Sequence, residues 1–244
     1  MCIRDSFLPL SVDYEERLYA VGKIPGGYVK REGRPTTKAI LVSRVIDRPL
    51  RPLFPKDYRN DTSINALTLA VDPDILPEIP AAIGASIALN ISDIPFDKLV
   101  GSIKVGIVDD KIVLNPNLEQ REKSTLDLTV SATEDKVCMI EAGAKEVPDE
   151  KMLEAIKAGH EEIKKLCKFI QEIKSEVGKK KAEYKSFAVP EEMVKFVDEL
   201  ATEKLKEAVQ TDTKKQRDEN VTNVDNLSLI HISEPTRPIC ISYA

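Results

Sequence analysis

Residues 26–55 read GGYVKREGRPTTKAILVSRVIDRPLRPLFP, a glycine-flanked loop followed by a helical pattern and a proline-rich run. From Lys30 to Arg51 the stretch has seven basic and two acidic side chains, a net charge of +5. The whole chain carries −5, so the residues outside this window carry −10. Cations gathered on one loop and one helix of an otherwise acidic protein predict a local site for a polyanion.

The middle of this stretch predicts a helix. Thr36 or Thr37 can cap its start, and it is expected to run to about Arg48, where Pro49 would end it. The proline-rich run that follows cannot be regular structure and is expected to be extended. Three aliphatic side chains would form the buried side of the helix: Ile40, Leu41 and Val45.

Two groups of side chains in this stretch are candidate ligands for phosphate groups. The loop group, in which the tyrosine ring offers a surface for stacking a base, is Tyr28, Lys30, Arg31 and Arg34. The helix group, whose guanidinium forks match phosphate oxygens two at a time, is Arg44, Arg48 and Arg51. The alternative is plain solvated surface, in which Arg48 pairs with Asp47 or Glu32.

Outside this stretch, alternating patterns predict strands and apolar stripes predict helices. Strands are expected near residues 7–20, 62–71, 102–108, 111–116, 126–130 and 136–141, with a tight turn at Asp109 and Asp110. Helices are expected at residues 80–92, 148–177 and 190–209, whereas residues 210–226 are polar and expected to be frayed. Gly84 would let its helix approach a sheet closely. This order predicts an α+β fold with a β-α-β-α core on a mixed sheet, a hairpin-rich second half and helices against one face.

The two ends of the chain are related through their coding DNA. MCIRDS is encoded by ATGTGTATAAGAGACAG plus one base, and the reverse complement of that string encodes Leu-Ser-Leu-Ile-His, the residues at 227–231. Both ends resemble a transposon-end sequencing adapter. We therefore expect residues 1–6 and 227–244 to be non-native and the remainder to be a fragment of a longer protein.

Composition excludes several classes of protein. No apolar run approaches the roughly 18 residues of a membrane helix, and no leader pattern argues for secretion. The four cysteines show no CxxC spacing, which favours a reduced, cytoplasmic setting. His160 is the only histidine outside the adapter-like ends, so no histidine-based metal site is expected, and no catalytic motif is recognisable. Cys138 and Cys167 are expected in the core, and Asp72 and Asp74 in a turn.

Three stretches carry a resemblance to a known family. They are residues 14–55, residues 65–96 (NALTLAVDPDILPEIPAAIGASIALNISDIPF) and VCMIEAGAKEVPDEKMLEAIKAGHEEI at 137–163. Over about residues 7–226 the chain resembles the first phosphorolytic core of the bacterial polynucleotide phosphorylase family. The resemblance implies an RNase PH-type core with an S5 domain 2-like β-α-β-α arrangement. Its N-terminal part would be residues 7–100, its C-terminal part 101–180, and a helical domain would begin at 190–226.

The resemblance also implies an activity and partners. Members degrade single-stranded RNA from its 3′ end with inorganic phosphate, releasing nucleoside diphosphates in a reversible, Mg²⁺-assisted reaction. They act as ring-shaped homotrimers, in some cases within an RNA-degradation complex. The catalytic and metal-binding acids belong to a second core that this chain lacks, so none is assigned here and the fragment alone is expected to be inactive. A non-catalytic RNA-binding ring subunit and a single-core tRNA-trimming exonuclease are the alternatives.

The family assigns roles to both groups of basic residues. Positions corresponding to Tyr28, Val29, Lys30 and Arg31 line the constriction of the RNA channel, and Arg34, Arg44, Arg48 and Arg51 resemble a remnant phosphate site. Val29 replaces a usual second aromatic residue and Lys30 a usual arginine. Both departures predict weaker binding of RNA, through weaker base stacking and weaker bidentate contact with phosphate.

Overall fold

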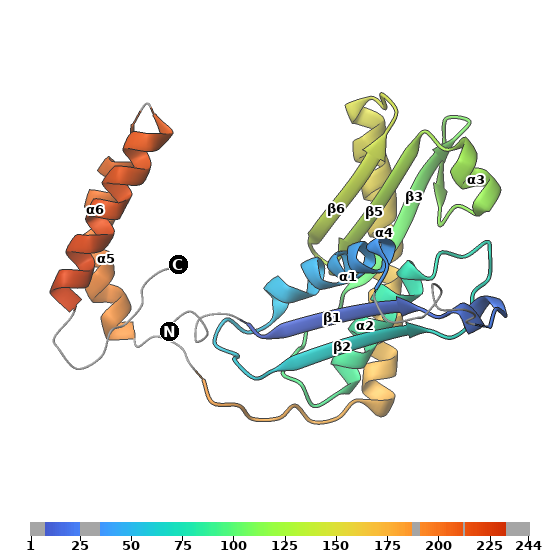
Figure 1. The fold of residues 1–244 in the computed structure, drawn as a ribbon, viewed down its shortest axis with the longest axis horizontal. Coiled ribbons are helices and arrows are strands. Elements are labelled where there is room, and N and C mark those ends of the chain that lie inside the picture. Colours follow the sequence, from blue (N-terminus) through green and yellow to red (C-terminus); the bar gives the residue numbers. More distant parts are fainter. Residues whose placement is uncertain (1–7, 25–34, 187–190, 212, 233–244) are drawn as a thin grey trace. The chain divides into compact units, whose positions relative to one another are not determined.

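The computed structural model describes residues 8–24, 35–186, 191–211 and 213–232 (Figure 1). The chain divides into two compact units. The first is Leu8–Lys185. The described part of the second consists mainly of two helices, α5 (Glu191–Val209) and α6 (Lys214–Ile232). The loop group of candidate ligands, Tyr28, Lys30, Arg31 and Arg34, lies outside the described residues.

The first half of the Leu8–Lys185 unit has the predicted β-α-β-α order (Figure 1). Its elements are β1 (Leu10–Glu16), α1 (Thr37–Leu50), β2 (Thr62–Thr68) and α2 (Glu78–Ile91), with short 3₁₀ helices η1 (Leu18–Val21) and η3 (Arg51–Leu53). β1 and β2 pair in parallel, with Leu10 opposite Thr62 and Glu16 opposite Thr68. Parallel strands need a long crossover connection, and α1 lies within it.

The second half is an antiparallel sheet backed by a long helix. Its elements are β3 (Gly101–Val108), β4 (Lys111–Leu114), α3 (Leu118–Lys123), β5 (Leu126–Ala132), β6 (Val137–Ala144) and α4 (Asp149–Val177), and the strand order is β4-β3-β5-β6. Asp109 and Asp110 join β3 to β4 with φ of 49° and 60°. Two successive left-handed residues match the twist of a hairpin, so the predicted tight turn is confirmed.

Each half has its own hydrophobic core. The first is formed by the inner faces of β1, β2, α1 and α2 around Tyr14, Ile46, Leu50, Leu89 and Phe96. The second is formed by β3, β5 and α4, including Ile103, Val105, Leu128, Val130 and Ile163. The expectation of a mixed sheet in the β-α-β-α core was wrong among the described strands, because that core has the parallel pair β1 and β2 and the antiparallel strands form a separate sheet.

Close packing of helix on sheet occurs at Gly159 and not at Gly84. A Cβ added to Gly159 would lie 3.1 Å from Cγ2 of Val105, whereas one added to Gly84 would meet no atom within 4 Å. Gly159 of α4 therefore allows the close approach to β3, as does Gly101 of β3, where an added Cβ would lie 2.9 Å from Cγ2 of Ile163. Along the predicted stripe of α4, Ile163, Cys167 and Ile170 are buried, but Leu153 and Val177 are more than half exposed.

Helix α1 is rotated relative to the prediction. Ile40 and Leu41 are 49% and 54% exposed, and the buried side is instead Ala39, Val42, Ile46, Pro49 and Leu50. The N-cap is as predicted, since Thr36 Oγ1 accepts from the Ala39 N–H at 3.1 Å. The Pro49 prediction was wrong, because the helix continues to Leu50 and the proline-rich run begins as η3. Pro49 has no N–H, so the helix lacks one hydrogen bond there, the one that would reach the Val45 carbonyl oxygen.

Two further elements differ from the sequence-based expectation. α3 was not predicted, although Asn117 and Gln120 form a capping box at its start. Residues 214–226, expected to be frayed, belong to α6, which extends to Ile232 and lies beside α5 (Figure 1). Helices also lie over both faces of the antiparallel sheet: α4 packs on one, while α1 and the start of α2 border the face that carries Lys104.

None of the helices in the described part of the chain combines the length and apolar character needed to cross a bilayer.

Candidate anion-binding surface

Arg44 and Arg48 lie one turn apart on α1, and both are exposed. Within the described part of the chain, no hydrogen bond or ion pair engages either guanidinium. Residues four apart share a helix face, so the two cations are available together. Of the alternative partners expected for Arg48, Asp47 pairs instead with Arg51, and Glu32 lies outside the described residues.

The guanidinium group of Arg51 forms hydrogen bonds within the protein. Its Nε and Nη2 donate to the two carboxylate oxygens of Asp47 at 2.9 and 2.8 Å, a bidentate pair. Its Nη1 donates to the carbonyl oxygen of Leu8 at 3.1 Å, and Nη2 also donates to that of Leu10 at 2.9 Å. Arg51 is thus half-buried between the end of α1 and β1, unlike Arg44 and Arg48.

A groove of about 580 Å³ runs between β1 and α1, and Arg44 and Arg51 both line it. Its β1 wall is residues 11–15, and its α1 wall includes Ser43, whose Oγ accepts the Tyr14 N–H at 3.0 Å. The groove brings two members of the predicted helix group to one surface. Arg48 does not line it.

The acids near the start of α1 are partly neutralised. Lys38 Nζ and the Tyr14 hydroxyl both donate to Glu16 Oε1, at 2.7 and 2.8 Å. Burial acts to raise the pKa of Glu16, but the bonds from Lys38 and Tyr14 outweigh it, and the pKa is lowered. Burial, in turn, raises the pKa of the Tyr14 hydroxyl well above its usual range.

A second charged site lies in a cleft of about 420 Å³ between α1, α2 and the antiparallel sheet, and the sequence analysis missed it. Lys104 Nζ of β3 lies 3.1 Å from both Glu78 Oε1 of α2 and Asp127 Oδ1 of β5. Burial acts to lower the pKa of Lys104, but the two carboxylates raise it overall. The only sequence signal was a lysine within the otherwise apolar strand SIKVGIV.

The described residues gather no group of three or more histidine, cysteine, aspartate or glutamate side chains suited to a metal ion. His160 Nε2 contacts the Thr133 carbonyl oxygen at 3.1 Å. Asp72 Oδ1 accepts the Asp74 N–H at 3.0 Å, which confirms the turn predicted there. Cys167 is buried as predicted, and Cys138 is half-buried.

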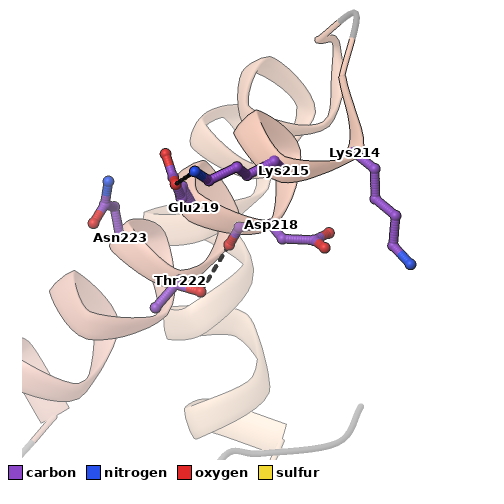
Figure 2. Close-up of a pocket in the computed structure, with 6 residues that line it drawn as sticks. All are labelled: Lys214, Lys215, Asp218, Glu219, Thr222 and Asn223. Carbon is purple, nitrogen blue, oxygen red and sulfur yellow. Dashed lines mark hydrogen bonds and ion pairs between the residues drawn. The ribbon is translucent and has the colours of Figure 1, made fainter.

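A shallow, open hollow of about 800 Å³ lies along α6 (Figure 2). Its lining side chains all come from that single helix, and they do not converge on one point. Lys215 lies 4.0 Å from Glu219, and Thr222 Oγ1 donates to the Asp218 carbonyl oxygen at 2.7 Å. Its charges are balanced within the helix, so it offers no distinct anion site.

Comparisons with known proteins place the chain in a family. The sequence models described as "3′ exoribonuclease family, domain 1" and "domain 2" match residues 3–95 and 98–162. The chain belongs to the 3′ exoribonuclease family. The boundary between the two exoribonuclease domains falls between α2 and β3, which is also where the two hydrophobic cores divide.

Relatives within the 3′ exoribonuclease family share a common name. The chain is 57% identical over 225 residues to the polyribonucleotide nucleotidyltransferase of Clostridioides difficile, covering 92% of this chain and 32% of the relative. It is 50% identical over 220 residues to that of Bacillus subtilis, covering 90% and 31%. The chain therefore spans about a third of the length of these relatives.

One solved structure supports the fold of this exoribonuclease-family chain. Rice Rrp46 matches with a TM-score of 0.54 at 13% identity, over 68% of this chain and 73% of that one. The α+β, RNase PH-type fold implied by the resemblance is confirmed.

Proposed function

We propose that this chain is the RNA-binding part of a polyribonucleotide nucleotidyltransferase that degrades RNA from its 3′ end by phosphorolysis. Family membership and the name shared by the relatives support the reaction. In that reaction an oxygen of inorganic phosphate bonds to the phosphorus of the terminal phosphodiester. The bond from that phosphorus to the 3′ oxygen of the preceding nucleotide breaks, and a nucleoside diphosphate leaves. The reverse reaction extends the RNA.

The observation that carries the RNA-binding role is the exposed pair Arg44 and Arg48 on α1. Each guanidinium can contact phosphate oxygens with two parallel N–H groups. Since the chain is acidic overall, this pair attracts the backbone of RNA locally without making the whole surface adhesive. We assign Tyr28, Lys30, Arg31 and Arg34 to the same RNA path on the strength of the family resemblance.

Mg²⁺, which the family implies, does not fit the described residues of this chain. Glu78 and Asp127 both line the charged cleft, and both are bound to Lys104. The Lys104 ammonium group lies between these two carboxylates and occupies the position that a metal ion bound by them would need. We therefore derive no step through a metal here, and we assign the catalytic acids to a second core outside this chain.

The lack of an acid cluster among the described residues is equally compatible with one alternative, a ring subunit that binds RNA without cleaving it. The two functions differ in the assembled protein. Phosphate-dependent release of nucleoside diphosphates by the longer protein supports the first, and RNA binding without release supports the second. We propose a homotrimer, cytoplasmic location and contact with an RNA-degradation complex on the resemblance alone.

RNA affinity tests the binding role directly. Fluorescence anisotropy with a labelled single-stranded RNA is expected to show weaker binding by Arg44→Ala/Arg48→Ala than by the parent chain. The matched control is Lys164→Ala/Lys168→Ala on α4, which removes the same charge at the same spacing. Equal weakening by both pairs would show that only net charge matters and would remove the site from α1. Nucleoside diphosphate release by this chain alone would contradict the assignment of catalysis to a second core.

A further inference from the structure

We infer that Arg51 does not bind phosphate but positions the arginines that do. The inference rests on the proposed function and changes the role of one residue in it. Arg51 was grouped with Arg44 and Arg48 because it continues their spacing along the sequence. The structure separates it from them by what its side chain contacts.

All three nitrogens of the Arg51 guanidinium donate hydrogen bonds within the protein. Nε and Nη2 are bound to the Asp47 carboxylate at 2.9 and 2.8 Å, and the carbonyl oxygens of Leu8 and Leu10 accept from Nη1 and Nη2 at 3.1 and 2.9 Å. A phosphate group that recruited Arg51 would have to displace a carboxylate bound by two parallel bonds. It would also remove one donor from each of the carbonyl oxygens of Leu8 and Leu10.

These bonds join the last turn of α1 to the chain at the start of β1. A second connection lies two turns earlier, where Ser43 Oγ accepts the Tyr14 N–H at 3.0 Å while its hydroxyl donates to the Ala39 carbonyl at 2.9 Å. Arg44 and Arg48 lie between these two connections along the helix. Rotation or sliding of α1 against β1 is therefore blocked at both ends of the segment that presents the arginines.

The charge balance supports the same role. Asp47 forms an ion pair with Arg51, with 2.8 Å between Oδ1 and Nη2. Because the two charges largely cancel, Arg51 adds little to the positive field over the groove. Arg44 and Arg48 have no such partner within the described residues. The field that attracts RNA therefore originates from two arginines on α1 and not from three.

The salt dependence of RNA binding separates a positioning residue from a phosphate ligand. Each phosphate contact on single-stranded RNA contributes about 0.7 to the slope of log K against log salt. We expect Arg51→Ala to weaken binding of a single-stranded RNA about three- to tenfold with an unchanged slope, because the number of phosphate contacts stays the same. We also expect its effect to vanish in an Arg44→Ala/Arg48→Ala background, since the residues it positions are gone. Two results would overturn the inference: a slope that becomes shallower by about 0.7, or a loss of affinity from Arg51→Ala that is as large in the Arg44→Ala/Arg48→Ala background as in the parent chain.

Asp47→Asn provides an independent test that does not require loss of the Arg51 side chain. If Arg51 were a phosphate ligand held back by Asp47, the substitution would strengthen RNA binding and steepen the slope. A positioning role predicts weaker binding with no steeper slope, because the bidentate pair is lost. If Arg51→Ala does not fold, as judged by circular dichroism, Asp47→Asn still decides the question.

The outcomes distinguish this inference from the proposed function. If Arg44→Ala/Arg48→Ala changes neither affinity nor slope, the proposed function is wrong and the inference falls with it. If that pair matters but Arg51→Ala lowers the slope, the proposed function stands and only the positioning role is overturned.

Discussion

The Tyr184 hydroxyl donates to the Asp57 carboxylate at 3.0 Å, joining residues 127 positions apart in the sequence. The Tyr184 ring also meets that of Tyr58 edge-on, with centroids 5.2 Å apart. Tyr184 belongs to the segment after α4, which returns across the first half of the unit. Two backbone bonds fix it there, from Lys179 to Ile91 and from Ala182 to Asp93. The segment therefore fastens the second half to the first.

Tyr184→Phe tests this connection with the least disturbance. It keeps the ring contact and removes one hydrogen bond, so the free energy of unfolding is expected to fall by about 1 kcal/mol. Urea denaturation measures the loss. A double-mutant cycle with Asp57→Ala should give a positive coupling energy, whereas purely additive losses would show that the two side chains do not interact.

Lys181 is expected to stabilise the C-terminal end of α2. Its ammonium group donates to the carbonyl oxygens of Leu89, Asn90 and Ser92 at 2.9 to 3.0 Å, and the last carbonyls of a helix have no partner within the helix. Lys181→Met should lower the free energy of unfolding by about 1–2 kcal/mol. Lys180→Met is the matched control, because Lys180 is next to Lys181 in the sequence and is exposed. Equal effects of both substitutions would rule out the cap.

The two partners of Lys104 should differ in importance. Glu78 is 18% exposed and Asp127 is 69% exposed. Lys104→Met leaves a largely buried carboxylate without compensation and should cost about 2–3 kcal/mol. Asp127→Asn removes a pair open to water and should cost below about 1 kcal/mol. Chemical denaturation of the two variants compares them, and a larger loss from Asp127→Asn would contradict this ranking.

Glu16 should make stability depend on pH. Its pKa in the folded chain lies below the ordinary value of 4.5, because Lys38 and Tyr14 bind the carboxylate despite its partial burial. The ionised group therefore stabilises the fold above that pH, and the contribution is lost as the pH falls through the lowered pKa. Glu16→Gln should destabilise the fold at pH 7 and have less effect at an acidic pH below the lowered pKa, where the carboxylate is protonated. An equal loss at both pH values, measured by urea denaturation, would show that the carboxylate charge is irrelevant.

Apart from α3 and α6, the order of strands and helices could be predicted from the sequence because it depends on local patterns. Alternation identified β2 to β6, and the Thr36 cap located the start of α1. The rotation of α1 could not be predicted, because Ile40 and Leu41 are as apolar as the buried Val42 and Ile46. The buried face is selected by contact with β1, made through Ser43 and Arg51, together with packing against α2.

The candidate site was predicted in composition but not in detail. Three arginines at regular spacing indicated one anion site, and two of them are exposed together as expected. The third pairs with Asp47, which the sequence shows only as one acid among several basic neighbours. The Lys104 cleft depends on residues from α2, β3 and β5, and no local pattern relates positions so far apart.

The salt dependence of RNA binding tests the central claim, that Arg44 and Arg48 bind RNA phosphates, most directly. The slope of log K against log salt is measured for the parent chain, for Arg44→Ala/Arg48→Ala and for Lys164→Ala/Lys168→Ala. The account predicts that the slope becomes shallower by about 1.4 for the α1 pair, since two contacts are lost at about 0.7 each. It should change little for the α4 pair. An unchanged slope for Arg44→Ala/Arg48→Ala would contradict it.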